Sequence, residues 1–326
     1  MDMPVSRRRF LQGTAAASVL SLATPELASP ALASTVDALP GNAELDSAFL
    51  EIVKIAGDAG KIRQVGTSRS GRKIMMLSLG DADRSALVVG GPHPNEPVGG
   101  ATVIRLARQL ASDSALRDKY GMAWHFIGAI DPDGLALNQG WLQAPRSLEN
   151  YNRHFFRPAF ADQPEYTFPL EVGNYRFDQP TPENLAWRNA LDLTRPAYQV
   201  SLHSADVGGV FYITSRNIPS LTKQLAEYPA RAGLNLNSFG EPFANLPSFA
   251  PGVFDFVNLS DLLTSAGDQA GNFWSAGDSS AGYSASRYGT FNLVCEVPLW
   301  DAAQFQDPSP SGFKSADLLN RHRQRL

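Results

Sequence analysis

The stretch ALVVGGPHPNEP (Ala86–Pro97) decides the fold. Its first four residues are an apolar run of strand length, and two glycines interrupt that run. Pro97 then opens a segment whose apolar residues recur with helical spacing. A proline costs little at the first helical position, because its missing N–H would have no partner there. The stretch therefore predicts a strand, a tight loop that carries His93 and Glu96, and a helix.

The chemistry of this loop points to a metal. A neutral imidazole and a carboxylate are good zinc ligands, and open α/β sheets place ligands where strands give way to helices. A catalytic zinc usually keeps three protein ligands and a water, so His93 and Glu96 supply two of the three. Taken alone, such a pair is more often a capped helix start with a solvated glutamate, and the rest of the chain must decide.

A third ligand is found among the five histidines of the chain. His203 closes the strand-like run Tyr198–His203, whereas His125 lies inside a strand pattern and His322 lies in the tail. His203 is therefore the best partner for His93. A structural histidine at the strand end is the alternative.

Glu296 is an unusual residue for the end of an apolar strand. The run FNLVCEV (Phe291–Val297) alternates so that Glu296 shares a face with Asn292 and Val294. A carboxylate near the end of a buried strand is costly unless it is paired, solvated or functional. A general base that accepts a proton from an activated water belongs in such a place. A surface glutamate at the sheet end is the alternative.

Composition favours one large domain and excludes a basic nucleic-acid-binding surface. The chain has 326 residues, 43% hydrophobic content and a formal net charge of −4. Its single cysteine, Cys295, permits no intramolecular disulfide, so an exported fold must depend on core burial, to which a metal could add.

The N-terminus predicts export. Arg7, Arg8 and Arg9 precede the mild apolar stretch Ala15–Leu22, and Ala31-Leu32-Ala33 offers a cleavage site. We expect a twin-arginine signal over residues 1–33, a linker over 34–44 and a catalytic domain over 45–326. The partner of the precursor would be the twin-arginine export machinery, and the destination the bacterial periplasm or exterior. The apolar stretch is too short for a stable membrane span.

Strand and helix patterns intermix along the chain, which predicts a single α/β domain with a central mixed β-sheet flanked by helices. Two long stretches, 138–186 and 235–289, lack clear periodicity, and 131–134 (DPDG) predicts a turn. Helices are expected at 44–59, 98–110, 187–193, 219–231 and 316–323, and strands at 62–67, 73–79, 86–89, 122–130, 198–203, 210–214 and 290–297.

The ordered set of motifs resembles the zinc carboxypeptidase family. His93-x-x-Glu96 is followed by Asn152-Arg153, then His203, then Glu296 on a late strand. The resemblance covers roughly residues 45–322. Two further stretches are similar to family motifs: 131–134 to Asn-Pro-Asp-Gly and 150–155 to Asp-x-Asn-Arg-Asn-Phe.

The resemblance implies roles for these residues. His93, Glu96 and His203 would bind one zinc ion per chain, and Glu296 would be the general base and proton shuttle. Asn152 and Arg153 would clamp the terminal carboxylate of a peptide substrate, for which a planar guanidinium is well shaped.

Several family residues have no secure counterpart. Arg146 fits the carbonyl-polarising arginine by its spacing from Asp133, but a register that aligns Trp141 places Leu142 there. The tyrosine that covers the substrate could be Tyr283 or Tyr288, and both could equally be packing groups.

Two positions near the expected ligands also depart from the family. Asn95 stands where the peptidases often have arginine, and Asn150 stands where an aspartate orients the first histidine. The carboxylate that supports this histidine would then be missing or come from elsewhere, such as Glu149.

The function expected from this set is a zinc metallocarboxypeptidase that removes C-terminal residues from protein-derived or cell-wall peptides. Zinc would activate a water, and Glu296 would take its proton as the amide is attacked. An N-acyl amino acid deacylase of the succinylglutamate desuccinylase and aspartoacylase type is one alternative. An inactive binding protein on the same scaffold is the other.

Overall fold

A computed structural model describes residues 39–142, 147–240, 246–267, 271 and 274–301. Within this part of the chain the fold is a single α/β domain with a large mixed sheet and helices on both faces, which confirms the predicted class. No helix in the described ranges combines the length and apolar character needed to cross a bilayer. The predicted signal over 1–33 and the terminal helix over 316–323 lie outside the described residues.

Nine strands form the main sheet, in the order β1-β2-β4-β3-β7-β12-β9-β11-β10. Two small ladders, β5 with β6 and β8 with β13, lie outside it. The strands are β1 Gly60–Thr67, β2 Lys73–Leu79, β3 Ser85–Gly90, β4 Ala123–Ile127, β5 Leu170–Val172, β6 Tyr175–Phe177, β7 Tyr198–His203, β8 Val207–Gly208, β9 Phe211–Thr214, β10 Ser248–Ala250, β11 Val253–Asp255, β12 Phe291–Glu296 and β13 Trp300–Asp301.

The centre of the sheet is parallel. Neighbouring strands β4, β3, β7 and β12 all run in one direction, so their carboxyl ends meet at a single edge. The loop after β3 carries His93 and Glu96, β7 ends at His203, and β12 ends at Glu296. Topology alone therefore brings these four residues to the same edge of the sheet.

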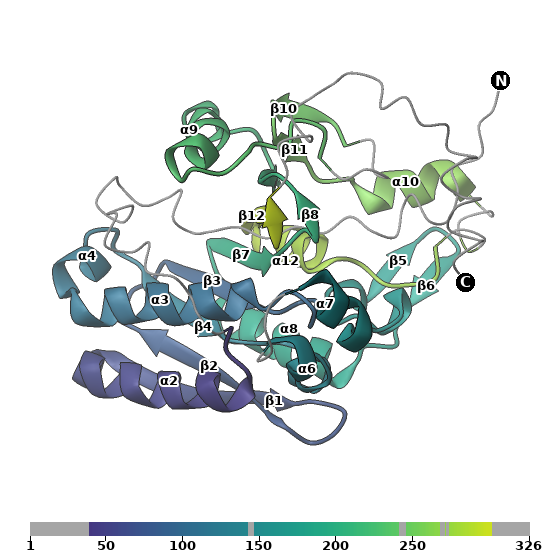
Figure 1. Cartoon of the computed structure of the whole chain (residues 1–326). Helices are drawn as coiled ribbons and strands as arrows, with labels where there is room; N and C mark the ends of the chain where they lie inside the picture. Colours follow the sequence, from purple (N-terminus) through teal and green to yellow (C-terminus); the bar gives the residue numbers. More distant parts are fainter. Residues whose placement is uncertain (1–38, 143–146, 241–245, 268–270, 272–273, 302–326) are drawn as a thin grey trace.

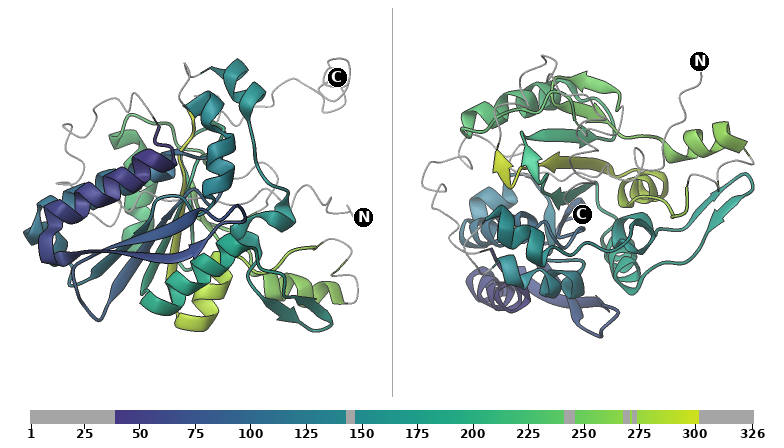
Figure 2. Two further views of the ribbon diagram at one scale, coloured as in Figure 1. Left: turned by 90° about the horizontal axis from the view of Figure 1, so that it is seen from below. Right: turned by 45° about the vertical axis from the view of Figure 1, so that its right-hand side comes forward.

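Helices cover both faces of the sheet (Figures 1 and 2). Helices α2, α3 and α9 pack on one face in the larger core cluster, and α8 and α12 pack on the other. The helices are α2 Asn42–Ala56, η4 Gly57–Ala59, α3 Val98–Ser112, α4 Ser114–Asp118, α5 Pro132–Leu137, α6 Gln139–Leu142, α7 Leu148–His154, η5 Phe160–Asp162, η6 Pro164–Tyr166, α8 Pro182–Thr194, α9 Pro219–Arg231, α10 Leu259–Ala266 and α12 Ser280–Tyr288.

Glycines allow the His93 loop to bend tightly against the sheet. A Cβ on Gly90 would lie 2.5 Å from the carbonyl oxygen of Gly128. Gly91 has a φ of +60°, the left-handed region that glycine adopts at little cost. Any larger residue at these two positions would displace the loop that carries the expected ligands.

Most of the predicted elements are confirmed, and the differences have physical causes. Asp131 and Pro132 begin helix α5 instead of a turn, because an N-cap aspartate and a proline at the first position favour a helix start as well. The short helix expected at 187–193 extends over Pro182–Thr194, with Thr181 as its N-cap. The stretches 138–186 and 235–289 contain several short elements that no periodicity marks.

Trp187 is the largest fully buried side chain of the second face, and its indole N–H donates to Gln199 Oε1 at 3.0 Å. We expect Trp187→Ala to lower the free energy of unfolding by about 3–5 kcal/mol, because it leaves a cavity and an unpaired glutamine oxygen. Denaturant unfolding would measure this. Leu193, 47% exposed on the same helix, provides the control: Leu193→Ala should change stability by less than about 0.5 kcal/mol. Equal effects would contradict the described packing.

Candidate metal centre

His93, Glu96 and His203 converge at the carboxyl edge of the parallel strands. His93 Nδ1 lies 2.9 Å from His203 Nδ1, and the Glu96 carboxylate lies 3.0 Å from the first and 2.8 Å from the second. All three side chains are buried. Ligands of a tetrahedral zinc with bonds of about 2 Å are roughly 3.3 Å apart, so the two nitrogens and the carboxylate form a donor set of nearly the right spacing.

An arginine that the sequence did not indicate also reaches this donor set. Arg157 Nη1 donates to Glu96 Oε1 at 3.0 Å, and its Nη2 donates to His93 Nδ1 at 2.9 Å. Its side chain is 26% exposed and lies in the segment after α7. A cationic group thus contacts the lone pairs to which a metal ion would bind. This contact supports the fit of these residues to a divalent cation.

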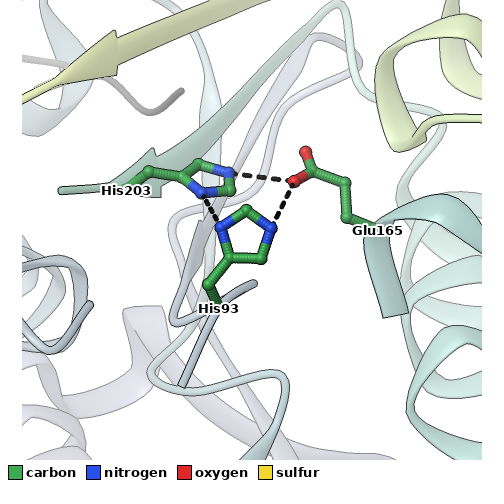
Figure 3. Close-up of side chains that lie close together, drawn as sticks. All are labelled: His93, Glu165 and His203. Atoms are coloured by element: carbon green, nitrogen blue, oxygen red, sulfur yellow. Dashed lines mark hydrogen bonds and ion pairs between the residues drawn. The ribbon is translucent and has the colours of Figure 1, made fainter. Parts of the chain in front are cut away.

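A second carboxylate lies on the opposite edge of both rings. Glu165 Oε2 is 3.1 Å from His203 Nε2 and 3.8 Å from His93 Nε2, as Figure 3 shows. His93, Glu165 and His203 thus also have ligand atoms that lie within 4.8 Å of one another. One ion cannot use both edges of the rings. We favour the Nδ1 edge with Glu96, because its donor atoms are closer together and Arg157 already occupies it.

The charges of the cluster are strongly coupled. Burial, reinforced by Arg157, lowers the pKa of His93 to about 4. Burial also opposes protonation of His203, but Glu165 and Glu96 outweigh it and raise its pKa to about 9. Burial raises the pKa of Glu96, yet the two imidazoles and Arg157 together hold it far below its ordinary value. The site therefore keeps a carboxylate ionised in the interior, as a metal ligand must be.

Glu296 lies beside this cluster on the neighbouring strand. It pairs in register with His203 across the parallel β7–β12 ladder, and it is only 2% exposed. Register partners on adjacent strands present their side chains to the same face of a sheet. On that face Gln199 donates to Asn292 Oδ1 at 2.8 Å, which confirms the predicted alternation of the strand. The strand register thus puts Glu296 next to His203 on the same face of the sheet.

Asn95 links the loop to helix α7. Its amide donates to the hydroxyl of Tyr151 at 3.2 Å, and that hydroxyl donates to Asp206. Tyr151 is 5% exposed and packs against Trp141 and Trp300. Asn95, which stands where the family's peptidases often have arginine, therefore helps to hold helix α7 against the loop.

The structure does not bring Asn152 and Arg153 to the donor set. Both are exposed on α7, and Arg153 donates to Glu149 Oε1 at 2.7 Å with its side chain 63% exposed. The cause is helical geometry: with Tyr151 turned inward, the next two residues point to solvent. Glu149 is occupied by this surface ion pair, so it does not support His93. Arg146 lies outside the described residues.

The two candidate tyrosines lie on or at the end of α12, on the second face of the sheet. Tyr283 packs against Phe168, with ring centroids 4.9 Å apart, and belongs to the core cluster of α8. The hydroxyl of Tyr288 donates to Asp192, and Arg287 donates to that hydroxyl. Both tyrosines thus contact α8 or its charged side chains, as expected of packing groups rather than of a tyrosine that covers the substrate.

The family model described as zinc carboxypeptidase matches residues 50–297. The chain belongs to the zinc carboxypeptidase family. No curated protein matches the chain.

Solved structures with the same fold are distant in sequence. Carboxypeptidase A from Helicoverpa armigera is 16% identical, with a TM-score of 0.51 and coverage of 85% of this chain and 70% of that one. A provisionally assigned metallopeptidase from Shewanella amazonensis is 13% identical, with a TM-score of 0.53 and coverage of 82% and 85%. The chain spans 61% of the length of a metallo-carboxypeptidase from Burkholderia cenocepacia. The likenesses to the Helicoverpa and Shewanella structures show the fold of this zinc carboxypeptidase family member.

Sequence reasoning missed Arg157 and Glu165. Both lie in the aperiodic stretch between α7 and α8, where spacing gives no indication of which side chains turn inward. The only available signal was the length of that stretch, because long irregular segments in compact domains are often functional.

Proposed function

We propose that this protein is an exported zinc metallocarboxypeptidase that hydrolyses the C-terminal peptide bond of peptide substrates. The observation that carries the proposal is the convergence of His93 Nδ1, His203 Nδ1 and the Glu96 carboxylate within 3.0 Å of one another, in a chain of the zinc carboxypeptidase family. A zinc ion held there would supply a Lewis acid for the scissile carbonyl and lower the pKa of a water.

The protein residues around the donor set have distinct proposed tasks. Glu296, buried beside His203, accepts the proton of the attacking water and returns it to the leaving amine. Its burial removes competing solvent and holds the carboxylate on the rigid end of β12. In this proposal Glu296 stays outside the ligand set, and its pairing with His203 across the β7–β12 ladder supports a role beside the metal.

Arg157 is the cation that we propose for substrate binding. The single lone pair of His93 Nδ1 cannot serve a metal ion and the Arg157 guanidinium at once. If His93 Nδ1 held an ion, the guanidinium would leave that nitrogen and could keep its hydrogen bond to Glu96 Oε1. It can then donate to the carbonyl oxygen or the terminal carboxylate of a peptide. This proposal replaces the clamp expected from Arg153, which is engaged at the surface.

Export through the twin-arginine machinery is part of the proposal and depends on the N-terminal motif alone. That machinery carries folded cargo, which suits an enzyme that acquires its metal before it leaves the cell. Protein-derived and cell-wall peptides both remain candidate substrates.

We expect the purified protein to contain about one zinc per chain and to release single C-terminal residues from peptides. Chelation by 1,10-phenanthroline should abolish release, and added zinc should restore it, because the proposed mechanism needs the metal to lower the pKa of the water that Glu296 deprotonates. Metal analysis and amino-acid release would be measured on the same sample, with N-acyl amino acids as a parallel substrate. Undiminished hydrolysis by metal-free protein would reject the proposal, and exclusive cleavage of the N-acyl substrates would favour a deacylase.

A further inference from the structure

Glu165 contacts both histidines of the centre from the edge that does not face Glu96. It lies in the single turn η6 and is 2% exposed. Its Oε1 accepts hydrogen bonds from the hydroxyls of Ser201 at 3.3 Å and Ser280 at 3.2 Å. Its Oε2 is turned toward the Nε2 atoms of the two rings, as the close-up shows (Figure 3). The carboxylate is thus anchored by one oxygen and offers the other to the imidazoles.

The contacts of His93 assign its two nitrogens. A guanidinium can only donate hydrogen bonds, so Nδ1, which receives Arg157 Nη2 at 2.9 Å, carries the lone pair. The ring proton of the neutral imidazole is then on Nε2, which faces Glu165 at 3.8 Å. The lone pair that a metal needs is thereby turned toward Glu96.

The contacts of His203 make its Nε2 a donor as well, while its Nδ1 donates to the Glu96 carboxylate at 2.8 Å, a proton that a bound metal ion would replace. Ser201 uses its hydroxyl hydrogen on Glu165, so its oxygen must accept from His203 Nε2, 2.9 Å away. Nε2 of His203 is therefore a donor, directed at both Ser201 and Glu165. Both rings then hold their Nε2–H groups toward Glu165, and both Nδ1 atoms lie on the other side, 2.9 Å apart.

We propose that Glu165 is the positioning residue that fixes the tautomer and orientation of both imidazoles, so that His93 and His203 present Nδ1 to the ion together with Glu96. The inference depends on the metal centre proposed above. Such outer carboxylates raise the basicity of ligating histidines and hold their rings in place. Asn150 cannot supply this charge, and Glu149 is engaged with Arg153. The supporting carboxylate would therefore come from the turn η6, where the one carboxylate of Glu165 faces the rings of both His93 and His203.

The test is zinc affinity, measured by competition with a chromogenic chelator on the full chain. We expect Glu165→Ala to weaken zinc binding by roughly 10- to 100-fold, and Glu165→Gln by less, since its amide oxygen can still accept. Glu96→Ala, which removes a ligand, should cost more than Glu165→Ala. Glu149→Ala is the matched surface control and should leave the affinity unchanged. Circular dichroism and thermal unfolding of the metal-free proteins would establish that each variant is folded, and Glu165→Gln serves if Glu165→Ala does not fold.

The outcomes separate this inference from the metal centre itself. Wild-type protein that fails to bind zinc would overturn the proposed function together with the role of Glu165. Wild-type binding with unchanged affinity in both Glu165 variants would overturn only the positioning role. A loss in Glu165→Ala equal to or greater than that in Glu96→Ala would show that Glu165 is itself the ligand, which also overturns the positioning role. With cobalt in place of zinc, a positioning role predicts that Glu165→Gln keeps the tetrahedral visible spectrum of the wild type.

Discussion

Glu296→Gln is expected to lower the kcat for release of a C-terminal residue by roughly 10²–10⁴-fold, the usual contribution of a general base. The amide has nearly the shape of the carboxylate but cannot accept the proton of the attacking water. KM and zinc content should change little, because Glu296 lies on the strand beside His203 and outside the proposed ligand set. Steady-state kinetics on a peptide substrate and metal analysis would measure the two effects.

A control variant separates loss of the base from disturbance of the sheet. Asn292→Ala on the same strand removes the oxygen that accepts from Gln199, so it perturbs the sheet face without removing an acid. It should reduce stability more than turnover. Full activity of Glu296→Gln would exclude the general-base role. If the wild type is also inactive but binds peptides, the inactive-scaffold interpretation would replace the enzyme.

Arg157→Ala is expected to lower kcat/KM by roughly 10²–10³-fold, as when a donor to the developing oxyanion is removed. Zinc affinity should not fall, since the guanidinium and the ion compete for the same lone pair of His93. This combination distinguishes a substrate-binding arginine from a structural one, whose loss would weaken the donor set. Kinetics and chelator competition on one preparation would give both values.

Arg153→Ala provides the comparison that decides between the two arginines. Arg153 is exposed and bonded to Glu149, so its removal should change kcat/KM by less than about threefold. A loss as large as that of Arg157→Ala would show that α7 rearranges when substrate binds and would return the clamp to Arg153. A small effect of Arg157→Ala would contradict the assignment made here.

The convergence of His93, Glu96 and His203, the proposed metal ligands, could be predicted from the sequence because strand patterns are local. Val88 and Val89 precede the His93 loop, and Tyr198–His203 forms a strand with the predicted bounds. Parallel strands bring their carboxyl ends to one edge, so placing the strands was enough to bring the three ligands together. Glu296 followed from the same reasoning, since alternation along β12 fixed its face.

The residues around the ligands could not be predicted, because tertiary contacts decide their direction. Glu165 turns inward in a single turn after Pro164, and Arg157 reaches back across the loop to Glu96. Nothing periodic marks either position. The stretch 150–155 showed the converse: its similarity to a family motif pointed to Arg153, but burial of Tyr151 set the helix rotation that directs Arg153 to solvent.

The strand order has a consequence for biosynthesis. Among the described strands of the main sheet, β12 comes last along the chain, and it is inserted between β7 and β9, which are made before it. In a nascent chain that has emerged only to residue 290, the edges of β7 and β9 lack the strand that pairs with both of them. The carboxylate at 296 arrives with that missing strand, so an ion captured earlier by the ribosome-bound fragment would have its ligands but no acid. Completion of this part of the sheet and arrival of the proposed general base are therefore a single step of folding.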